Sequence, residues 1–412
     1  MDGLVTRQRG VVAVLVAIAL LALLAMVAFA LDSGHLILNK SRLQNTVDAA
    51  ALSAAKVLDK TGSETQATTA ARAVFDANAA NQPELLRAIR GSDILLQYSN
   101  TLDPWAPGTV PANYVRVIAQ NFTMWRSFSS LVGVDDIRTA ASAVAGPSAP
   151  VGFTQGNEAC DLAPMMVCAN TAPGAPGDYG YTTDKVSLLK YAAPGSPNVG
   201  PGNFQLVRLG GPGANIVRAN VAGGYEACVD PSGSIETQPG NDVGPLTQGL
   251  NTRFGQYQGP VNATDYPPDK VTTSPNPQLD VAGDDTTVIF KNGGPVTNVS
   301  QLSFKYSNYE TRLQNGPFDF PNGKPQRRVV AVPFVNCAGN NNGQTSMPVV
   351  GLGCFFLLQP AKQQGNKNYV FAQYIGECGA NGTPGPAPDP NPVSGPGIYK
   401  IVLHNDPLSP DS

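Results

Sequence analysis

Apolar side chains dominate the start of the chain, where residues 11–31 carry no polar side chain. A helix over these residues would be about 31 Å long, close to the thickness of a bilayer's hydrocarbon core. Arg7 and Arg9 precede the run, and basic residues favour the cytoplasmic side of a membrane. The pattern therefore predicts a membrane-spanning helix with a cytoplasmic N-terminus.

A second pattern begins where the apolar run ends. Apolar residues recur there at heptad-like spacing, which places them on one face of a helix. They are Leu36, Leu43, Val47, Ala50, Ala54 and Val57. Gly34 interrupts the pattern, because glycine costs about 1 kcal/mol relative to alanine inside a helix. We predict one helix, or two nearly coaxial helices, over residues 9–59, with these six residues packing against a partner protein.

A cleaved signal peptide is the alternative interpretation of the apolar run. Ala28-Phe29-Ala30 fits the small-x-small pattern of a cleavage site. However, the run is longer than the usual signal-peptide core of about 7–15 residues, and a helical pattern continues behind it. We therefore predict that the segment is retained as an anchor.

The rest of the chain predicts an α+β fold. Residues 60–146 form a small juxtamembrane α+β module, with a helix over 64–81 and strands over 93–99, 113–120 and 136–144. Beyond residue 147, short apolar runs alternate with Gly, Pro and Asn turns, which favours a larger Gly/Pro-rich, mostly-β extracytoplasmic domain. Its strands are expected at 203–209, 285–290, 301–307, 327–335, 347–358, 368–375 and 398–404. The predicted segments are 1–59, 60–146, 147–378 and 379–412, the last a Pro/Gly connector with a terminal strand.

All six cysteines follow the apolar run. An even number of cysteines in an exported chain indicates disulfides, whereas in a reducing compartment they would be small buried apolar residues. The short separation of Cys160 and Cys168 predicts a bond between them. The other four are predicted to pair among themselves: Cys228, Cys337, Cys354 and Cys378.

Charge and candidate chemistry exclude several functions. The net charge of −3 gives no basic surface for nucleic acid. The chain has two histidines, His35 and His404, and no C-x-x-C motif, so we predict no catalytic residue, no metal ion and no cofactor. Residues 230–234 spell D-x-S-x-S, whose oxygens could bind Mg²⁺. Because no apolar strand precedes this motif and no helix follows it, we predict a plain β-turn there.

Three N-terminal motifs resemble the TadE/TadG-like family of Flp pilus assembly. They are Arg9-Gly10, Asp32-Ser33-Gly34, and R-L-Q-N-T-V-D-A-A-A-L over residues 42–52. More faintly, "CDLAPMMVC", "GPLTQGLNTRF" and "CFFLLQP" look like segments of longer TadG-like proteins. Related pseudopilins are cut after the glycine and carry a glutamate five residues on, where this chain has Leu15. This departure favours an uncut, TadG-like anchor.

The resemblance implies a membrane-anchored structural or assembly component of a Flp (Tad) pilus or a related secretion apparatus, and not an enzyme. Its expected place is the bacterial inner membrane, crossed once, with a cytoplasmic N-terminus and a periplasmic body. Its expected partners are the lipid bilayer and other pilus-assembly (Tad) proteins, bound through the N-terminal helix, with no nucleic acid. The alternative is an anchored or secreted adhesive β-domain protein, with or without a metal.

Overall fold

The computed structural model describes residues 9–82, 88–123, 138–149, 158–190, 203–230, 232–284, 286–339, 342–365, 367–379 and 397–409. The chain divides into two compact units. The first comprises Met1–Lys56, Glu64–Ala145 and Leu403–Ser412, and the second comprises Val57–Ser63 and Gly146–Val402. The four-segment division expected from the sequence stays a prediction. Residues 380–396 of the expected connector lie outside the described residues.

The N-terminal segment forms one continuous helix, α1 (Arg9–Thr61), and not the two nearly coaxial helices that Gly34 would have allowed. Its 53 residues correspond to about 80 Å of helix. The large apolar side chains between Val12 and Leu31 are exposed, and no residue in the most apolar window of the helix is buried. Among the described residues, this is one helix that is long and apolar enough to cross a membrane.

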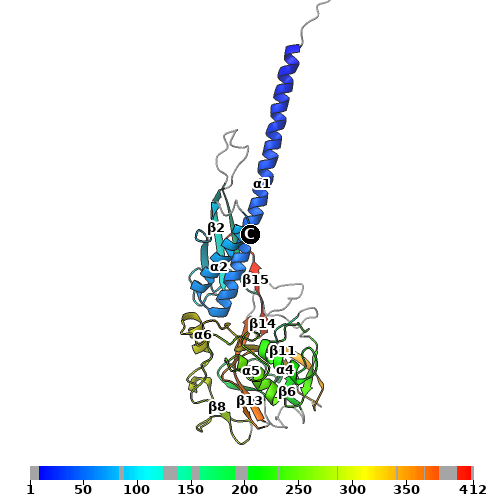
Figure 1. The fold of residues 1–412 in the computed structure, drawn as a ribbon, viewed down its shortest axis with the longest axis vertical. Coiled ribbons are helices and arrows are strands. Elements are labelled where there is room, and N and C mark those ends of the chain that lie inside the picture. Colours follow the sequence, from blue (N-terminus) through cyan, green and yellow to red (C-terminus); the bar gives the residue numbers. More distant parts are fainter. Residues whose placement is uncertain are drawn as a thin grey trace, which may run out of the picture. The chain divides into compact units, whose positions relative to one another are not determined.

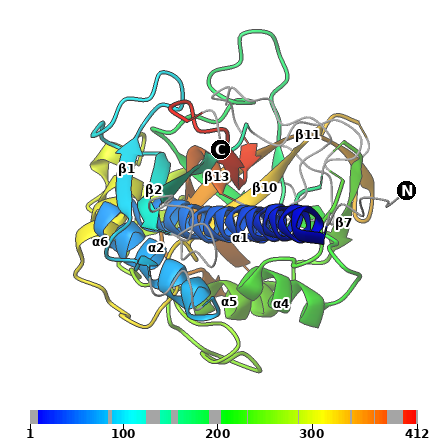
Figure 2. The ribbon, with the colours of Figure 1, turned by 90° about the horizontal axis from the view of Figure 1, so that it is seen from above.

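The first unit combines helices with a four-stranded sheet. Its second helix is α2 (Glu64–Ala80), which lies beside the C-terminal part of α1 in Figure 1 and Figure 2. The sheet has the order β1-β2-β3-β15. Its strands are β1 (Leu95–Ser99), β2 (Tyr114–Thr123), β3 (Arg138–Pro147) and β15 (Ile401–His404).

Small side chains allow α2 to lie close to its neighbours. Its buried positions recur every four residues, which aligns them on one helix face. They are Ala67, Ala71, Phe75 and Ala79. Tyr98 of β1 fixes the helix at its start, because its hydroxyl donates to the carbonyl of Glu64 at 2.9 Å and lies 2.7 Å from Thr68 Oγ1.

The second unit contains a larger β-structure. A nine-stranded sheet follows the path β12-β13-β11-β10-β4, with β5 and β14 paired to β13, β7 paired to β11, and β6 paired to β7. The strands are β4 (Val167–Cys168), β5 (Val186–Lys190), β6 (Asn203–Val207), β7 (Ser234–Pro239), β10 (Val329–Val335), β11 (Ser346–Leu357), β12 (Lys362–Gln364), β13 (Lys367–Gly379) and β14 (Gly397–Tyr399). A separate hairpin joins β8 (Leu279–Val281) to β9 (Val288–Phe290).

Short helices pack around this β-structure. They are α4 (Ala214–Gly223), α5 (Val243–Thr252), the 3₁₀ helix η2 (Val299–Gln301) and α6 (Tyr306–Asn315). Helices α4 and α5 lie side by side (Figure 2). Their close approach requires Gly249, because a Cβ atom there would collide with the backbone carbonyl of Arg218.

The predicted α+β class is confirmed: a long apolar N-terminal helix precedes a few helices and a larger, mostly-β body. The strand predicted over 301–307 is wrong, because η2 ends and α6 begins within this range. Tyr309 and Leu313 of α6 are buried one helical turn apart, so a helical rather than an alternating pattern covers the core. Helices α4 and α5 were also not predicted.

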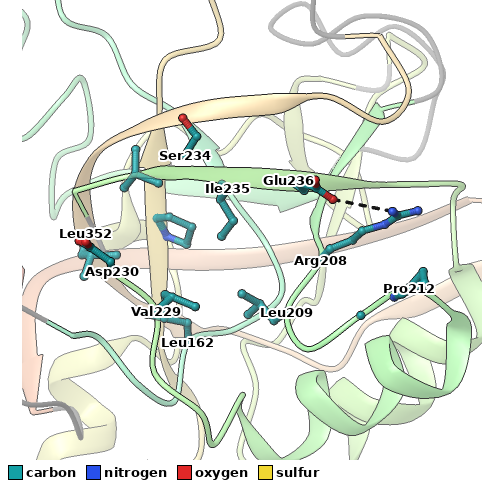
Figure 3. Close-up of a pocket in the computed structure, with 13 residues that line it drawn as sticks. Leu162, Arg208, Leu209, Pro212, Val229, Asp230, Ser234, Ile235, Glu236 and Leu352 are labelled. Carbon is teal, nitrogen blue, oxygen red and sulfur yellow. Dashed lines mark ion pairs between the residues drawn. The ribbon is translucent and has the colours of Figure 1, made fainter.

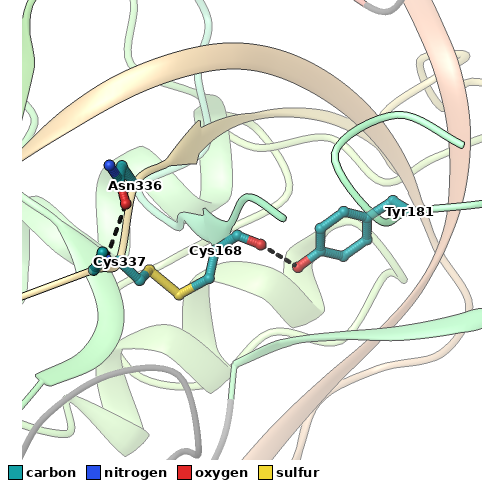
Figure 4. The surroundings of a disulfide bond; sticks show 5 residues. Cys168, Tyr181, Asn336 and Cys337 are labelled. Atoms are coloured by element: carbon teal, nitrogen blue, oxygen red, sulfur yellow. Dashed lines mark hydrogen bonds between the residues drawn. A yellow bond between two sulfur atoms is a disulfide. The ribbon is translucent and has the colours of Figure 1, made fainter. Parts of the chain in front are cut away.

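All six cysteines form disulfides: Cys160–Cys228, Cys168–Cys337 and Cys354–Cys378. The predicted Cys160–Cys168 bond is therefore wrong. Cys168 lies on β4, which pairs in parallel with β10 and so brings it to Cys337, just beyond the end of β10. Figure 4 shows this bond, with the Tyr181 hydroxyl donating to the Cys168 carbonyl at 3.3 Å.

This connectivity gives a direct chemical prediction. Digestion of the unreduced, alkylated protein with proteases that cleave between Cys160 and Cys168 and between Cys337 and Cys354 should release three linked peptide pairs and no alkylated cysteine. Mass spectrometry before and after reduction identifies the partners, and reduced protein that is then alkylated serves as the control. A linked Cys160–Cys168 peptide pair would contradict the fold around β4.

Candidate functional sites

The apolar stripe of α1 lies in the core of the first unit. Leu43, Val47, Ala50 and Ala54 are all 0% exposed, whereas Leu36 and Val57 are half-buried. The assignment of the four buried residues to a partner surface therefore needs correction. Their side chains are already covered within the chain. The helical period correctly predicted a buried face of the helix, but it did not show which part of the protein covers that face.

Polar residues of the R-L-Q-N-T-V-D motif also serve this internal docking. Gln44 Nε2 donates to the carbonyl of Ser142 in β3 at 2.8 Å and to Asp48 Oδ1 at 2.8 Å. Burial raises the pKa of Asp48, and the hydrogen bond from Gln44 partly offsets this rise. The motif therefore contains both apolar and polar groups that attach α1 to the sheet.

A different side of α1 remains accessible. Ile37 is 69% exposed and Leu38 is 47% exposed, and Ser41 and Asn45 follow on the same side, also exposed. We call these four residues the outer stripe. These two neighbouring exposed apolar side chains, beyond the most apolar part of the helix, form a candidate interaction surface. The sequence pattern alone did not separate this side from the buried one.

The last turn of α1 belongs to the second unit. Asp59 Oδ1 accepts a hydrogen bond from the Tyr399 hydroxyl at 2.6 Å, and Gln326 Nε2 donates to the Asp59 carbonyl at 2.9 Å. Burial raises the pKa of Asp59, while the hydrogen bond from Tyr399 and the charge of Lys60 oppose this rise. The helix that carries the apolar span therefore ends in a specific polar contact.

The second unit also has a pocket of about 340 Å³ (Figure 3). Its walls are mostly apolar, with Leu209 and Ile235 facing inward, and Arg208 and Glu236 at one end are 3.8 Å apart. The described lining residues include no histidine, cysteine or lysine. The pocket suits an apolar group beside a polar one, but the lining shows no nucleophile paired with a base.

The D-x-S-x-S segment borders this pocket through Asp230 and Ser234. Asp230 Oδ1 accepts hydrogen bonds from the Ser232 amide at 2.8 Å and from the Ser232 hydroxyl at 2.6 Å. These bonds lower the pKa of Asp230 and engage two of the groups that a metal ion would need. Pro231 lies outside the described residues. Among the residues that are described, no group of three or more His, Cys, Asp or Glu side chains is arranged to hold a metal ion.

The two histidines belong to different elements. His35 lies on α1, and His404 on β15 packs edge-on against the Tyr114 ring, with centroids 5.5 Å apart. The absence of an enzymatic activity stays a prediction.

Residues 10–57 match the family described as putative Flp pilus-assembly TadE/G-like. No curated protein and no solved structure matches the chain. The matched segment covers the apolar span and the buried face of α1, so the resemblance noted in the sequence is confirmed for this helix.

Proposed function

We propose that this protein is a membrane-anchored structural component in the assembly of a Flp (Tad) pilus or a related secretion apparatus. One observation carries the proposal: a single helix that matches the pilus-assembly family runs from an exposed apolar span into a folded body. Exposed apolar side chains along about 30 Å of helix are stable in a bilayer and costly in water.

The proposed location is the bacterial inner membrane, crossed once, with a cytoplasmic N-terminus and a periplasmic body. Arg7 and Arg9 support this orientation, since basic residues remain on the cytoplasmic side. The three disulfides support a body outside the cytoplasm, where thiols become oxidised.

The outer stripe is the proposed contact for other assembly proteins. Ile37 and Leu38 lie about 10 Å along the helix beyond Leu31, which places them close to the membrane surface. A partner helix crossing the same membrane could reach them without displacing the core of the first unit. Leu43 and Val47 cannot take this role while they are buried.

Changing the outer stripe tests the proposal. The double variant Ile37→Glu/Leu38→Glu should abolish pili or Tad-dependent secretion, because two charges would replace the apolar contact. Protein level and disulfides should be unchanged, since both side chains are exposed. Pili are imaged and secreted protein is measured in the native host.

The matched control is Leu95→Glu/Val110→Glu, which changes two exposed apolar residues of the same unit away from α1. This control should assemble pili normally. Normal pili in the Ile37/Leu38 variant would contradict the proposed contact. The adhesive alternative predicts the opposite pattern, with normal pili but reduced attachment when Asp230, Ser232 and Ser234 are replaced with Ala.

A further inference from the structure

A buried lysine in the second unit is held by two side-chain amides. Lys190, the last residue of β5, is 0% exposed. Its Nζ atom donates to Oδ1 of Asn241 and to Oδ1 of Asn368, each at 2.5 Å. The amine therefore lies against the carbonyl groups of two carboxamides in a site from which bulk water is excluded.

Strand pairing brings Lys190 and Asn368 together. Strands β5 and β13 are antiparallel, with Lys190 opposite Val370. Asn368 precedes Val370 by two residues and so lies on the same face of the sheet, in the diagonal position that long side chains can reach. Both residues are held by the sheet backbone, which limits the motions that would separate them.

The Asn368 amide has a fixed orientation. Its Nδ2 donates to the Val243 carbonyl at 3.1 Å and to Thr247 Oγ1 at 3.2 Å, both in α5. These acceptors keep Nδ2 away from the lysine and direct Oδ1 toward it. Because a carbonyl bond is about 1.2 Å long, Cγ of Asn368 lies no more than about 3.7 Å from Nζ, close to the separation of reacting atoms.

The surroundings also favour a nucleophilic amine. Burial lowers the pKa of Lys190 to about 7, against the opposing charge of Asp242. An exposed lysine has a pKa of about 10.4 and is almost fully protonated at neutral pH. At pH 7 a substantial fraction of Lys190 is therefore the neutral amine, the form that attacks carbonyl carbon.

We propose that Lys190 and Asn368 form an intramolecular isopeptide bond. Nζ attacks Cγ of Asn368, a bond forms between them, and the bond from Cγ to Nδ2 breaks. A proton from the amine passes to Nδ2, which leaves as ammonia, so the reaction needs no oxidant or reductant. The proposed carrier of this proton is Asp242, a carboxylate whose charge acts on Lys190.

Asn368 is a better target for attack by the amine than Asn241. Asn241 is only half-buried, and the following residue, Asp242, adopts a left-handed backbone with φ of 39° at the start of α5. Asn368 is 0% exposed, and its leaving nitrogen already contacts a hydroxyl that can stabilise it. The product would join β5 covalently to its sheet neighbour β13.

Peptide mapping of the purified full-length protein tests the bond. After reduction and digestion, we expect a branched peptide that joins the segments containing Lys190 and Asn368, with the loss of one ammonia. Succinimide formation at asparagine also releases ammonia, so fragmentation of the branched peptide, rather than intact mass, is decisive.

Three variants complete the test. Lys190→Met and Asn368→Ala should yield only linear peptides, whereas Asn241→Ala should keep the branch. Separate linear peptides containing Lys190 and Asn368 in the unaltered protein would overturn the proposal, whether or not the variants fold. A branch at Asn241 would overturn the assignment of Asn368 as the acceptor.

Discussion

Replacing Leu43 and Val47 together with lysine is expected to unfold the first unit. Both side chains are 0% exposed on the face of α1 that the unit covers. Truncating one buried Leu costs about 2–5 kcal/mol, and an unpaired buried charge adds several more. Two such changes approach the whole stability of a typical domain, about 5–15 kcal/mol.

Tryptophan fluorescence can follow this loss, because Trp105 is half-buried in the first unit. The matched control is Ser41→Lys/Asn45→Lys, which adds the same charges to exposed positions of the same helix. The control should unfold at nearly the temperature of the unaltered protein. Equal melting temperatures for the two double variants would show that Leu43 and Val47 do not belong to the core of the first unit.

The second large effect is expected at Arg328, whose side chain is 0% exposed in the second unit. Its guanidinium makes five hydrogen bonds, at 2.8–3.0 Å, and all go to backbone carbonyls. The acceptors are Val271, Thr273, Leu357 and Leu358. Phe254 and Phe356 lie against the guanidinium, with ring centroids 4.6 and 4.4 Å from Cζ of Arg328. These contacts help to hold the guanidinium in position.

Arg328→Lys should destabilise the second unit by roughly 2–6 kcal/mol, because lysine has only three donors and leaves buried carbonyls unpaired. Arg328→Met should cost more, since it also removes the positive charge near buried Asp269. Chemical denaturation monitored by hydrogen exchange measures the loss of stability of the second unit. Arg208→Lys is the control, since that side chain is 21% exposed, and it should change stability little. Equal stability of Arg328→Lys and the unaltered protein would contradict the five-donor role.

Local patterns in the sequence predicted the elements that are apolar over a continuous run or along one helix face. The apolar run and the heptad-like stripe predicted α1, and short apolar runs bounded by Gly, Pro and Asn turns predicted β10, β11 and β13. Ten-residue helices were harder to predict, because α6 buries only Tyr309 and Leu313. Two buried positions also occur in a short strand, so tertiary packing decides between the two structures.

The candidate sites depended on contacts between distant residues and were therefore less predictable. The sequence placed Leu43 and Val47 on one helix face, but it did not show that the chain itself covers that face. Arg328 follows another arginine at the start of an apolar strand, a position usually exposed to water. Lys190 and Asn368 are 178 residues apart, so only the pairing of β5 with β13 reveals their contact.

The disulfide connectivity has a consequence for biogenesis. The Cys160–Cys228 and Cys168–Cys337 bonds interleave along the chain. If the body is translocated across the membrane in N-to-C order, as the proposed topology requires, Cys160 and Cys168 enter the oxidising compartment before either native partner. Rapid oxidation would then join them to each other, the pairing that proximity in sequence suggests and the fold does not contain. Productive maturation therefore calls for thiol–disulfide exchange, and a disulfide isomerase should limit the yield of this protein more than an oxidase does.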